Sequence, residues 1–478
     1  MIRCLRVEWK RPAANRETPR KPWPSAPVGS AGRMVDAAPG RAGDFLAART
    51  RAGVDVFVLP TRKFKTKLVR LHWRTPSSRR NAARALVPNL MRRGTRRHPS
   101  MADVSRAFES LYGSSWSFSV YKHGQAQITS LRLETVEERF LPGKPAIFAP
   151  AVALMRELLF EPHLVRGAFP EDVFAQERLN HRREIEAQYN DKMTWAFQRL
   201  LDVTFGEEPY GLPVLGTVEQ ANALQGGDAI AAWTDLKERL PVRIFAVGDF
   251  ALAEVEAIAD EFFAPARPDA DAAAAVRPPP AASEPRLLIE RDDVSQSKLI
   301  TARLVDLSDL DEREFDALRV YAGVLGGGFH SRMFQSIREK HSLAYFASAS
   351  LDRLRGVLFT SCGIDASDRE KVGELTEKEI ASLRDAPPRD DELEQTRRLM
   401  ISGARGMFDS AGGMVETLEA GLSAGRVRTL DAICRSLAAV TAADITRVAR
   451  RIGPVRTIYC LEGAARHAAA DEPGGGEA

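Results

Sequence analysis

Eight histidines and four cysteines are the side chains of this 478-residue chain that could bind a transition metal, and their spacing gives no site. No two histidines lie three or four residues apart, the spacing that places two ligands on one face of a helix. The cysteines are scattered and include no C-x-x-C pair. This pattern is typical of idle thiols in a reducing compartment and argues against a disulfide framework or a structural zinc site.

The most specific stretch is "LGGGFHSRMFQSIREKHSLAYFASAS" (325–350). Three consecutive glycines separate two helical stretches there: Gly326, Gly327 and Gly328. Arg338 lies on the second helix, and Tyr345 begins the strand that follows. The pattern predicts a helix C-cap and a turn at which glycine tolerates left-handed backbone angles. A nucleotide-binding loop is disfavoured, because no Lys-Ser/Thr follows the glycines and a helix, not a strand, precedes them.

The elements around these residues occur twice in the same order. In the first half we expect strands at 54–60 and 66–74, helices at 79–93 and 101–112, a hairpin at 114–136, helices at 148–160, 171–203 and 226–237, and a strand at 242–250. In the second half we expect strands at 285–291 and 297–307, helices at 311–325 and 330–341, a hairpin at 343–365, helices at 367–384 and 389–408, and a strand at 455–463. The repetition predicts a duplicated α+β unit, each copy a largely antiparallel sheet with helices on one face.

Three segments without apolar periodicity separate and flank these halves. Residues 1–44 are predicted to be a disordered, basic, Pro-rich leader, 264–285 a Pro/Ala-rich linker and 466–478 a disordered tail. The two domains are therefore expected at 45–263 and 286–465.

The net charge of +4 is concentrated at the N-terminus, because residues 1–33 carry eight basic and two acidic side chains. The remainder sums to −2, so the bulk charge does not point to nucleic acid as a partner. No apolar run approaches the roughly 20 residues needed to cross a bilayer, and no signal-peptide core is visible near Met1. We expect a cytoplasmic protein without a membrane span.

From about Gly53 to Gly463 the chain resembles the insulinase/pitrilysin-type peptidases. The resemblance is carried by the glycine turn with its "SLAY" sequence, by "GEEPYGLPVLGTVEQANAL" (206–224) and by "AVGDF" (246–250). Those enzymes are clamshells of two related halves around a peptide chamber. The resemblance implies that Arg338 and Tyr345 donate hydrogen bonds to the substrate carbonyl and stabilise its oxyanion, beside the glycines of the turn.

Two further stretches resemble one subgroup of this family, the elongation-factor-P aminopentanol modification-associated proteins. They are "VLPTRKFKTKLVRLHW" (58–73) and "REIEAQYNDKMTWAFQRLL" (183–201). The subgroup name associates the chain with modification of a translation factor.

Active members of the family carry H-x-x-E-H on the first helix of the first half, shortly before a Gly-Thr pair. Counting back from Gly94 and Thr95 places those positions at Ala85, Pro88 and Asn89. Alanine offers no donor atom, proline cannot act as a base, and a single Asn carbonyl is a poor zinc ligand. Glu184 matches the third zinc ligand of the family, but a lone carboxylate does not hold zinc. We read it as a remnant on a solvated helix face.

These features predict a catalytically silent peptidase homologue without a catalytic residue, metal or cofactor of its own. The resemblance implies a heterodimer with an active H-x-x-E-H homologue, or self-association, and a peptide or protein as substrate. Zinc is then expected only in the partner subunit. Two alternatives stay open: a zinc endopeptidase with a non-standard site, and a peptide-binding scaffold that has no peptidase partner.

Overall fold

A computed structural model describes residues 40–263 and 285–463 of the chain. The linker expected at 264–285 and the tail expected at 466–478 lie outside the described residues, apart from residue 285, and so does the leader as far as residue 39. The last residues of the expected leader belong to the fold, because a first strand, β1, spans Gly40–Ala42 and pairs with the next strand. The leader boundary at residue 44 is therefore wrong by a few residues.

The strands form two sheets. The first sheet has seven strands: β1 (Gly40–Ala42), β2 (Phe45–Arg49), β3 (Asp55–Pro60), β4 (Thr66–Pro76), β5 (Ser115–His123), β6 (Ala126–Val136) and β7 (Val242–Gly248). The second has five: β8 (Arg286–Arg291), β9 (Ser297–Val305), β10 (Ala344–Asp352), β11 (Val357–Ile364) and β12 (Ile452–Glu462).

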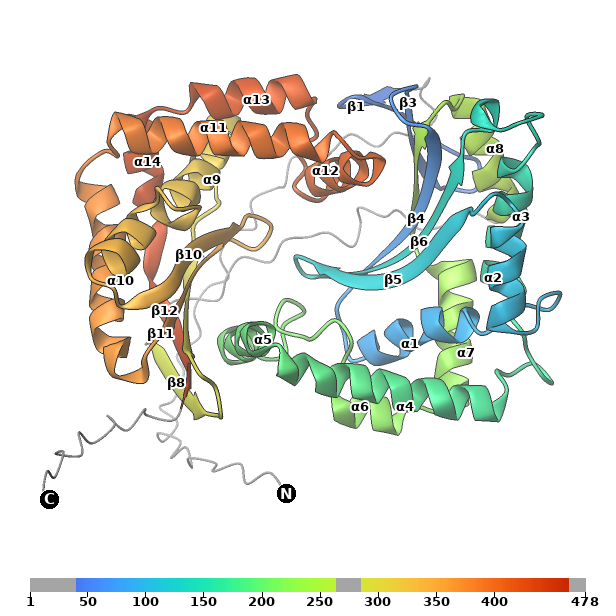
Figure 1. The fold of residues 1–478 in the computed structure, drawn as a ribbon, viewed down its shortest axis with the longest axis horizontal. Coiled ribbons are helices and arrows are strands. Elements are labelled where there is room, and N and C mark those ends of the chain that lie inside the picture. Colours follow the sequence, from blue (N-terminus) through green and yellow to red (C-terminus); the bar gives the residue numbers. More distant parts are fainter. Residues whose placement is uncertain (1–39, 264–284, 464–478) are drawn as a thin grey trace, which may run out of the picture. The chain divides into compact units, whose positions relative to one another are not determined.

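The two sheets share one topology (Figure 1). The order β3-β7-β4-β6-β5 in the first corresponds, strand for strand, to β8-β12-β9-β11-β10 in the second. In each sheet a single pair is parallel, β3 with β7 and β12 with β8, and the other pairs are antiparallel. The α+β fold class and the repeated architecture expected from the sequence are confirmed.

The helices are distributed over both halves of the chain. Those of the first half are α1 (Asn81–Met91), α2 (Met101–Glu109), α3 (Phe148–Phe160), α4 (Glu171–Ala187), α5 (Lys192–Phe205), α6 (Val218–Ala223), α7 (Gly226–Thr234) and α8 (Leu252–Phe262). Those of the second half are α9 (Glu312–Gly326), the short π-helix η4 (Phe334–Lys340), α10 (Arg369–Asp385), α11 (Asp390–Met407), α12 (Ala411–Ser423), α13 (Leu430–Ala439) and α14 (Ala442–Ala449).

The single helix expected at 171–203 is wrong, because the chain breaks it into α4 and α5. Asp191 stands at the break with non-helical backbone angles, and its side chain accepts hydrogen bonds from the backbone N–H groups of Met193 and Thr194. A new N-cap thus begins a second helix, as an aspartate favours at that position. The break allows α5 to leave α4 and pack elsewhere.

Each sheet packs one face against helices from its own half of the chain. In the first half, apolar residues of β4, β6 and β7 form a core with α1, α3, α7 and α8. In the second, residues of β9, β10 and β11 form a core with α9, α10 and α14. Burial of this apolar surface is the main stabilising contribution to the fold.

The other face of each sheet is covered by a helix from the opposite half, which the sequence did not predict. Helix α5 packs Ala196, Leu200 and Phe205 against the second sheet. Helix α12 packs Met414 and Leu418, among others, against the first. The described residues of the two halves, 40–263 and 285–463, consequently belong to one compact unit.

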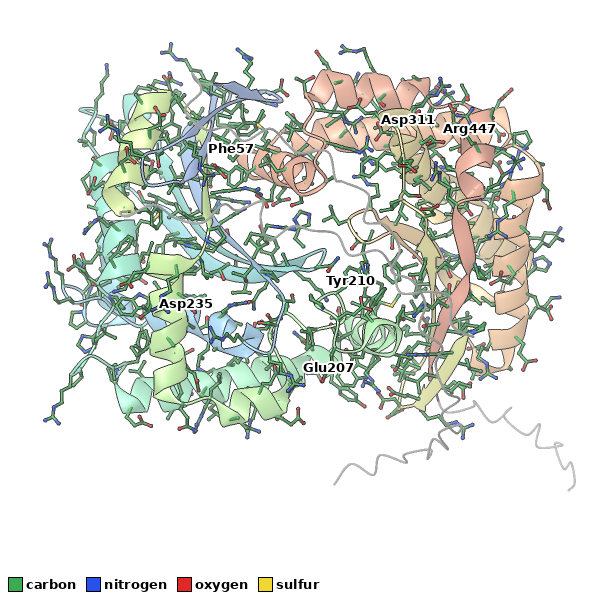
Figure 2. The ribbon with its side chains drawn as sticks, turned by 180° about the vertical axis from the view of Figure 1, so that it is seen from behind. Phe57, Glu207, Tyr210, Asp235, Asp311 and Arg447 are labelled. Carbon is green, nitrogen blue, oxygen red and sulfur yellow. The ribbon has the colours of Figure 1, made fainter. Side chains whose placement is uncertain are left out.

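Aromatic stacking marks the surface that α12 covers. Phe57 of β3, labelled in Figure 2, stacks on Phe245 of β7 at 5.4 Å between ring centroids. Both rings belong to the cluster that includes Met414 and Leu418. Since β3 and β7 are adjacent strands, the two rings form one apolar platform for the helix.

A buried charge cluster lies at the same contact. The Glu419 carboxylate of α12 lies 3.3 Å from the Arg243 guanidinium and 3.7 Å from Nδ1 of His72, and all three side chains are buried. Arg74 donates a hydrogen bond to Ser423 one turn later at 3.2 Å. Burial alone would raise the pKa of Glu419, but His72 and Arg243 outweigh burial and hold that pKa at about 2.

Substituting Glu419→Gln should destabilise the chain by about 3–5 kcal/mol at pH 7, because it leaves the Arg243 charge buried without its carboxylate. The folded pKa of Glu419 lies below its unfolded value, so its stabilising contribution is present above about pH 4.5 and is lost as the pH falls towards 2. Urea denaturation of both proteins between pH 3 and 8 measures the difference.

The matched control is Glu416→Gln on the same helix. The Glu416 side chain is 56% exposed and lies 3.5 Å from Arg70, so its loss should cost less than about 1 kcal/mol. Equal stability losses in the two variants would show that the buried cluster does not hold α12 on the first sheet.

Candidate functional site

Helix α1 carries Ala85, Pro88 and Asn89, the three positions that the family resemblance assigns to the zinc motif. Ala85 and Pro88 are buried, and Asn89 is partly exposed. The helix runs through Pro88 although a proline lacks the N–H that would bond to the carbonyl of Arg84. Buried Leu86 and Leu90 hold α1 in the core of the first half. The helix is thus retained for packing, while the residues at the three motif positions cannot bind zinc.

The surroundings of α1 are closely packed. A Cβ atom on Gly216 would lie 2.6 Å from Cβ of Ala82, so the segment before α6 lies directly on the start of the helix. Next to Gly216, the Leu215 carbonyl accepts a hydrogen bond from Nε2 of buried His181 at 2.9 Å. Burial lowers the pKa of His181, so its ring is neutral at pH 7. No local pattern of residues predicted this structural role of His181.

Glu184 lies on α4, which packs against α1. Its side chain is exposed, and neighbouring Arg182 pairs with Glu186 at 3.5 Å. Within residues 40–263 and 285–463 no group of three or more His, Cys, Asp and Glu side chains is arranged to hold a metal ion. The residues present therefore do not fit the zinc that the fold family implies, and no chemical step is assigned to a metal here.

Arg338 and Tyr345 lie on η4 and at the start of β10, two elements that pack against each other. The Arg338 side chain is 43% exposed and lies over the Phe334 ring at 4.8 Å, and its nearest carboxylate is that of Glu339 at 3.9 Å. Tyr345 is 49% exposed and occupies a register shift in the pairing of β10 with β11. In the described part of the chain no hydrogen bond joins either side chain to α1 or α4, and both are accessible to solvent.

The glycines before Arg338 serve a different purpose from the one expected. The predicted helix C-cap is confirmed at Gly327, but none of Gly326, Gly327 and Gly328 has a left-handed backbone. A Cβ on Gly326 would lie 2.2 Å from the backbone nitrogen of Ala349 on β10. Glycine is needed here because α9 ends in direct contact with the strand that Tyr345 begins.

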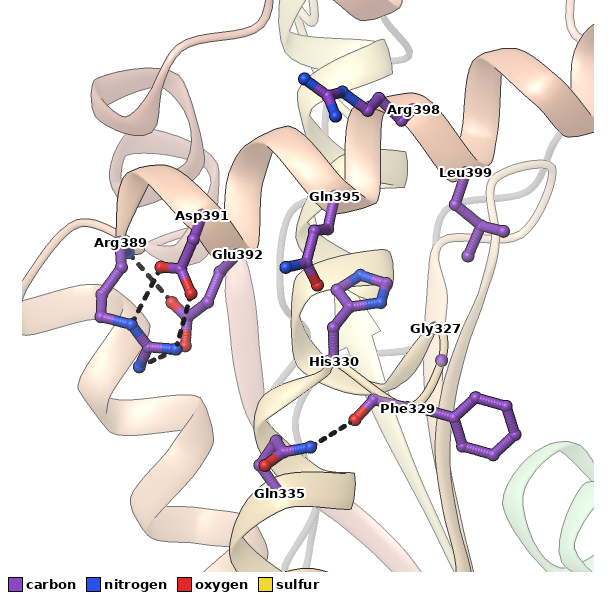
Figure 3. Close-up of a pocket in the computed structure, with 11 residues that line it drawn as sticks. Gly327, Phe329, His330, Gln335, Arg389, Asp391, Glu392, Gln395, Arg398 and Leu399 are labelled. Carbon is purple, nitrogen blue, oxygen red and sulfur yellow. Dashed lines mark hydrogen bonds and ion pairs between the residues drawn. The ribbon is translucent and has the colours of Figure 1, made fainter.

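A pocket of about 930 Å³ opens beside this turn, and we call it the glycine-turn pocket (Figure 3). Its walls come from the turn itself, from η4 and from the first turns of α11, and they include Gly328, Phe329, His330, Gln335, Gln395 and Leu399. The sequence singled out the glycines but not the residues of α11, which lie some 60 positions further along the chain and meet the turn only in the folded protein.

The two long hairpins, β5–β6 and β10–β11, meet at their tips. A Cβ on Gly124 would lie 3.1 Å from Leu354, and the segment between α5 and α6 joins the two. Tyr210 of this segment donates a hydrogen bond to Asp352 at 2.7 Å, and Lys122 donates one to the Leu212 carbonyl at 2.9 Å. Burial lowers the pKa of Lys122 to about 8. The "GEEPYGL" sequence thus contributes a structural contact between the hairpins.

No helix in the described part of the chain is both long enough and apolar enough to cross a membrane.

Comparison with known proteins agrees with this architecture. Residues 242–400 match the family model described as the peptidase M16 inactive domain. Over 414 residues the chain is 26% identical to the "probable inactive metalloprotease YmfF" of Bacillus subtilis, covering 86% of this chain and 96% of that protein. An uncharacterised zinc protease of Streptomyces coelicolor is 27% identical over 257 residues, 52% of this chain and 55% of its own.

Solved structures show the same fold over nearly the whole chain. A conserved protein from Enterococcus faecalis V583 superimposes with a TM-score of 0.82 at 28% identity, covering 89% of this chain and 100% of that one. A peptidase M16 inactive domain from Pseudomonas fluorescens superimposes with a TM-score of 0.71 at 19% identity, covering 88% and 99%. In sequence and in fold the chain is thus similar to degenerate members of the insulinase-type (M16) peptidase superfamily.

Proposed function

We propose that this chain is the catalytically silent subunit of a two-chain peptidase, paired with a homologue that carries an intact H-x-x-E-H motif. The partner supplies zinc and the general base, and this chain supplies Arg338 and Tyr345 to the substrate carbonyl. One observation carries the proposal. The chain exposes an Arg/Tyr donor pair, while its own α1 offers Ala85, Pro88 and Asn89 where zinc ligands would be required.

The exposure of the donors supports this division of roles. A tyrosine hydroxyl and a guanidinium that face outward can reach a carbonyl oxygen of a bound peptide, and preorganised donors of this kind stabilise the charge that develops on that oxygen. The relative from Bacillus subtilis, described as inactive, supports the silent character of the chain. The substrate is a peptide or protein, and the likeness of residues 58–73 and 183–201 to translation-factor modification proteins suggests that process as the setting.

The first prediction concerns the metal. After dialysis the purified chain should contain well under one zinc per molecule. The triple variant Ala85→His, Pro88→Glu, Asn89→His should bind zinc, because it restores ligands at i and i+4 on one helical face. Zinc content by plasma mass spectrometry and the rise in Tm on adding zinc sulfate measure both.

The matched control is the double variant Pro88→Glu, Asn89→His, which keeps Ala85 and has one histidine ligand fewer. It should show no rise in Tm with zinc. A tightly held zinc in the unmodified protein would overturn the silent character of the chain, and a triple variant without zinc affinity would show that the motif positions lie elsewhere.

The second prediction concerns the donor pair. In a complex reconstituted from this chain and an H-x-x-E-H homologue captured from the native cell, Arg338→Ala with Tyr345→Phe should lower kcat about 10²- to 10³-fold for peptide turnover. Subunit affinity and Tm should change little, because both side chains are exposed. Steady-state kinetics and analytical ultracentrifugation measure the two effects.

The control for the donor pair is Lys340→Ala with Tyr112→Phe, which removes one exposed cation and one exposed hydroxyl elsewhere. Its turnover should equal that of the unmodified complex. Unchanged turnover in the Arg338/Tyr345 variant would contradict the assigned donor role, and capture of no peptidase homologue would contradict the two-chain arrangement.

A further inference from the structure

The glycine-turn pocket has an apolar wall. Phe329 is 76% exposed and Leu399 is 50% exposed, unusually high values for large apolar side chains. Phe329 packs edge-on against Phe334 at 5.1 Å between centroids, and Phe334 in turn lies under the Arg338 guanidinium. The apolar wall therefore extends up to Arg338, the proposed oxyanion donor. One bound peptide can place a side chain against the wall and a neighbouring carbonyl at Arg338.

Gly328 keeps the floor of the pocket open. A Cβ at this position would lie 3.3 Å from Cε1 of His330 and 3.5 Å from Cδ2 of Leu399, so it would fill space between the two side chains. The backbone of Gly328 is not left-handed, so no conformational demand explains the glycine. Gly328 is therefore important because it has no side chain, which leaves the space between His330 and Leu399 free.

His330 presents a hydrogen-bond acceptor beside this space. Its Nε2 lies 2.9 Å from the Thr396 hydroxyl, which itself donates to the Glu392 carbonyl at 2.8 Å. The hydroxyl therefore accepts from His330, which places the proton on Nε2 and leaves Nδ1 without one. Burial lowers the pKa of His330, so the ring is neutral at pH 7. Nδ1 lies 3.4 Å from the position of the missing Gly328 Cβ.

Gln395 provides the complementary donor. Its side chain extends from α11 towards the His330 ring (Figure 3), and it is exposed, with no hydrogen bond to another described residue. One acceptor on His330 and one amide donor on Gln395 match the backbone N–H and C=O groups of a single peptide residue.

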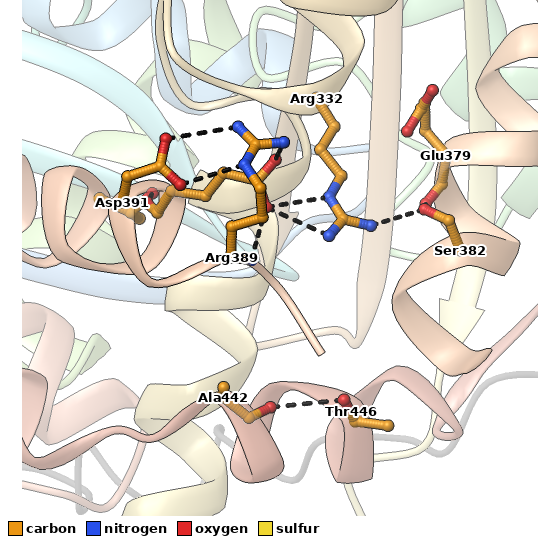
Figure 4. Close-up of polar contacts among 9 residues, drawn as sticks. Arg332, Glu379, Ser382, Arg389, Asp391, Ala442 and Thr446 are labelled. Carbon is orange, nitrogen blue, oxygen red and sulfur yellow. Dashed lines mark hydrogen bonds and ion pairs between the residues drawn. The ribbon is translucent and has the colours of Figure 1, made fainter. Parts of the chain in front are cut away.

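The charged groups at the far end of the pocket are already paired. Glu392 accepts from Arg332 at 3.1 Å and Arg389 lies 3.0 Å from it, while Arg389 also donates to Asp391 at 3.1 Å (Figure 4). Arg398, on the rim, donates to Glu394 at 2.6 Å. A pocket with balanced charges and an apolar wall favours a neutral, apolar occupant over an ionic one.

We propose that the glycine-turn pocket binds one large apolar residue of the peptide substrate, whose backbone N–H donates to Nδ1 of His330 and whose carbonyl accepts from the Gln395 amide. The apolar side chain lies against Phe329 and Leu399 over the floor left by Gly328. This inference rests on the proposed function and adds a residue class to its substrate.

The experiment uses the full chain and a fluorescein-labelled heptapeptide, Gly-Ser-Ala-Phe-Ala-Ser-Gly, with fluorescence polarisation as the readout. Replacing the central Phe by Ser should weaken binding at least tenfold. Gly328→Ala should weaken binding of the Phe peptide about tenfold or more, because one added methyl group in a fitted pocket has an effect of that order. Gln395→Ala should weaken it about fivefold through a lost hydrogen bond.

The matched control is Gly406→Ala, the same substitution at an exposed position of α11 where an added Cβ meets nothing within 4 Å. It should bind the Phe peptide like the unmodified chain. Gln395 is exposed, so its variant tests the pocket even if Gly328→Ala lowers Tm.

Equal affinity for the Phe and Ser peptides, or equal binding by Gly328→Ala and Gly406→Ala, would overturn the pocket assignment. That result alone leaves the proposed function intact if turnover by the reconstituted complex still requires Arg338 and Tyr345. A complex that cleaves no peptide, although its subunits associate, would instead overturn the proposed function.

Discussion

The structure depends on one carboxylate, that of Glu419, which is buried between the two halves and contacts residues of the first sheet. Helix α12 follows the last long helix of the second half, yet its apolar face packs on the first sheet and places Glu419 among His72 and Arg243. Helix α5 makes the reciprocal contact with the second sheet. Because neither sheet covers both of its faces with helices from its own half, each half completes the core of the other. The hairpin tips, and Tyr210 with its bond to Asp352, add to this junction.

This arrangement explains how a peptidase fold can persist without its metal ligands. Helix α1 contributes Leu86 and Leu90 to the core, so packing stabilises the helix although positions 85, 88 and 89 carry no zinc ligand. In the second half the residues of interest lie at the surface and not in the core. There η4 and β10 hold Arg338 and Tyr345 at the surface, and Gly326 brings α9 into contact with β10. The proposed donors of the second half are therefore held at the surface, while α1 keeps its place in the core of the first half.

The amino-acid sequence determined the repeated α+β architecture, both long hairpins and the positions of most helices, because alternating and helical apolar patterns are local properties of the chain. It also determined that Ala85, Pro88 and Asn89 cannot hold zinc, since that conclusion needs only residue types. The helix expected over 171–203 was wrong because the N-cap at Asp191 breaks it. The C-cap expected at the glycine turn is confirmed at Gly327, but without a left-handed backbone, and close packing is what requires Gly326.

Only the tertiary structure decided which segments from distant parts of the chain meet. No helix was expected in the segment that forms α12, and nothing local indicates that the Glu419 carboxylate will be buried beside Arg243. The same holds for Gln395, which reaches the glycine turn only after α11 has packed against α9. Burial, charge pairing and pocket shape arise from contacts between residues far apart in sequence, so a single sequence fixes the candidate side chains while folding decides their neighbours.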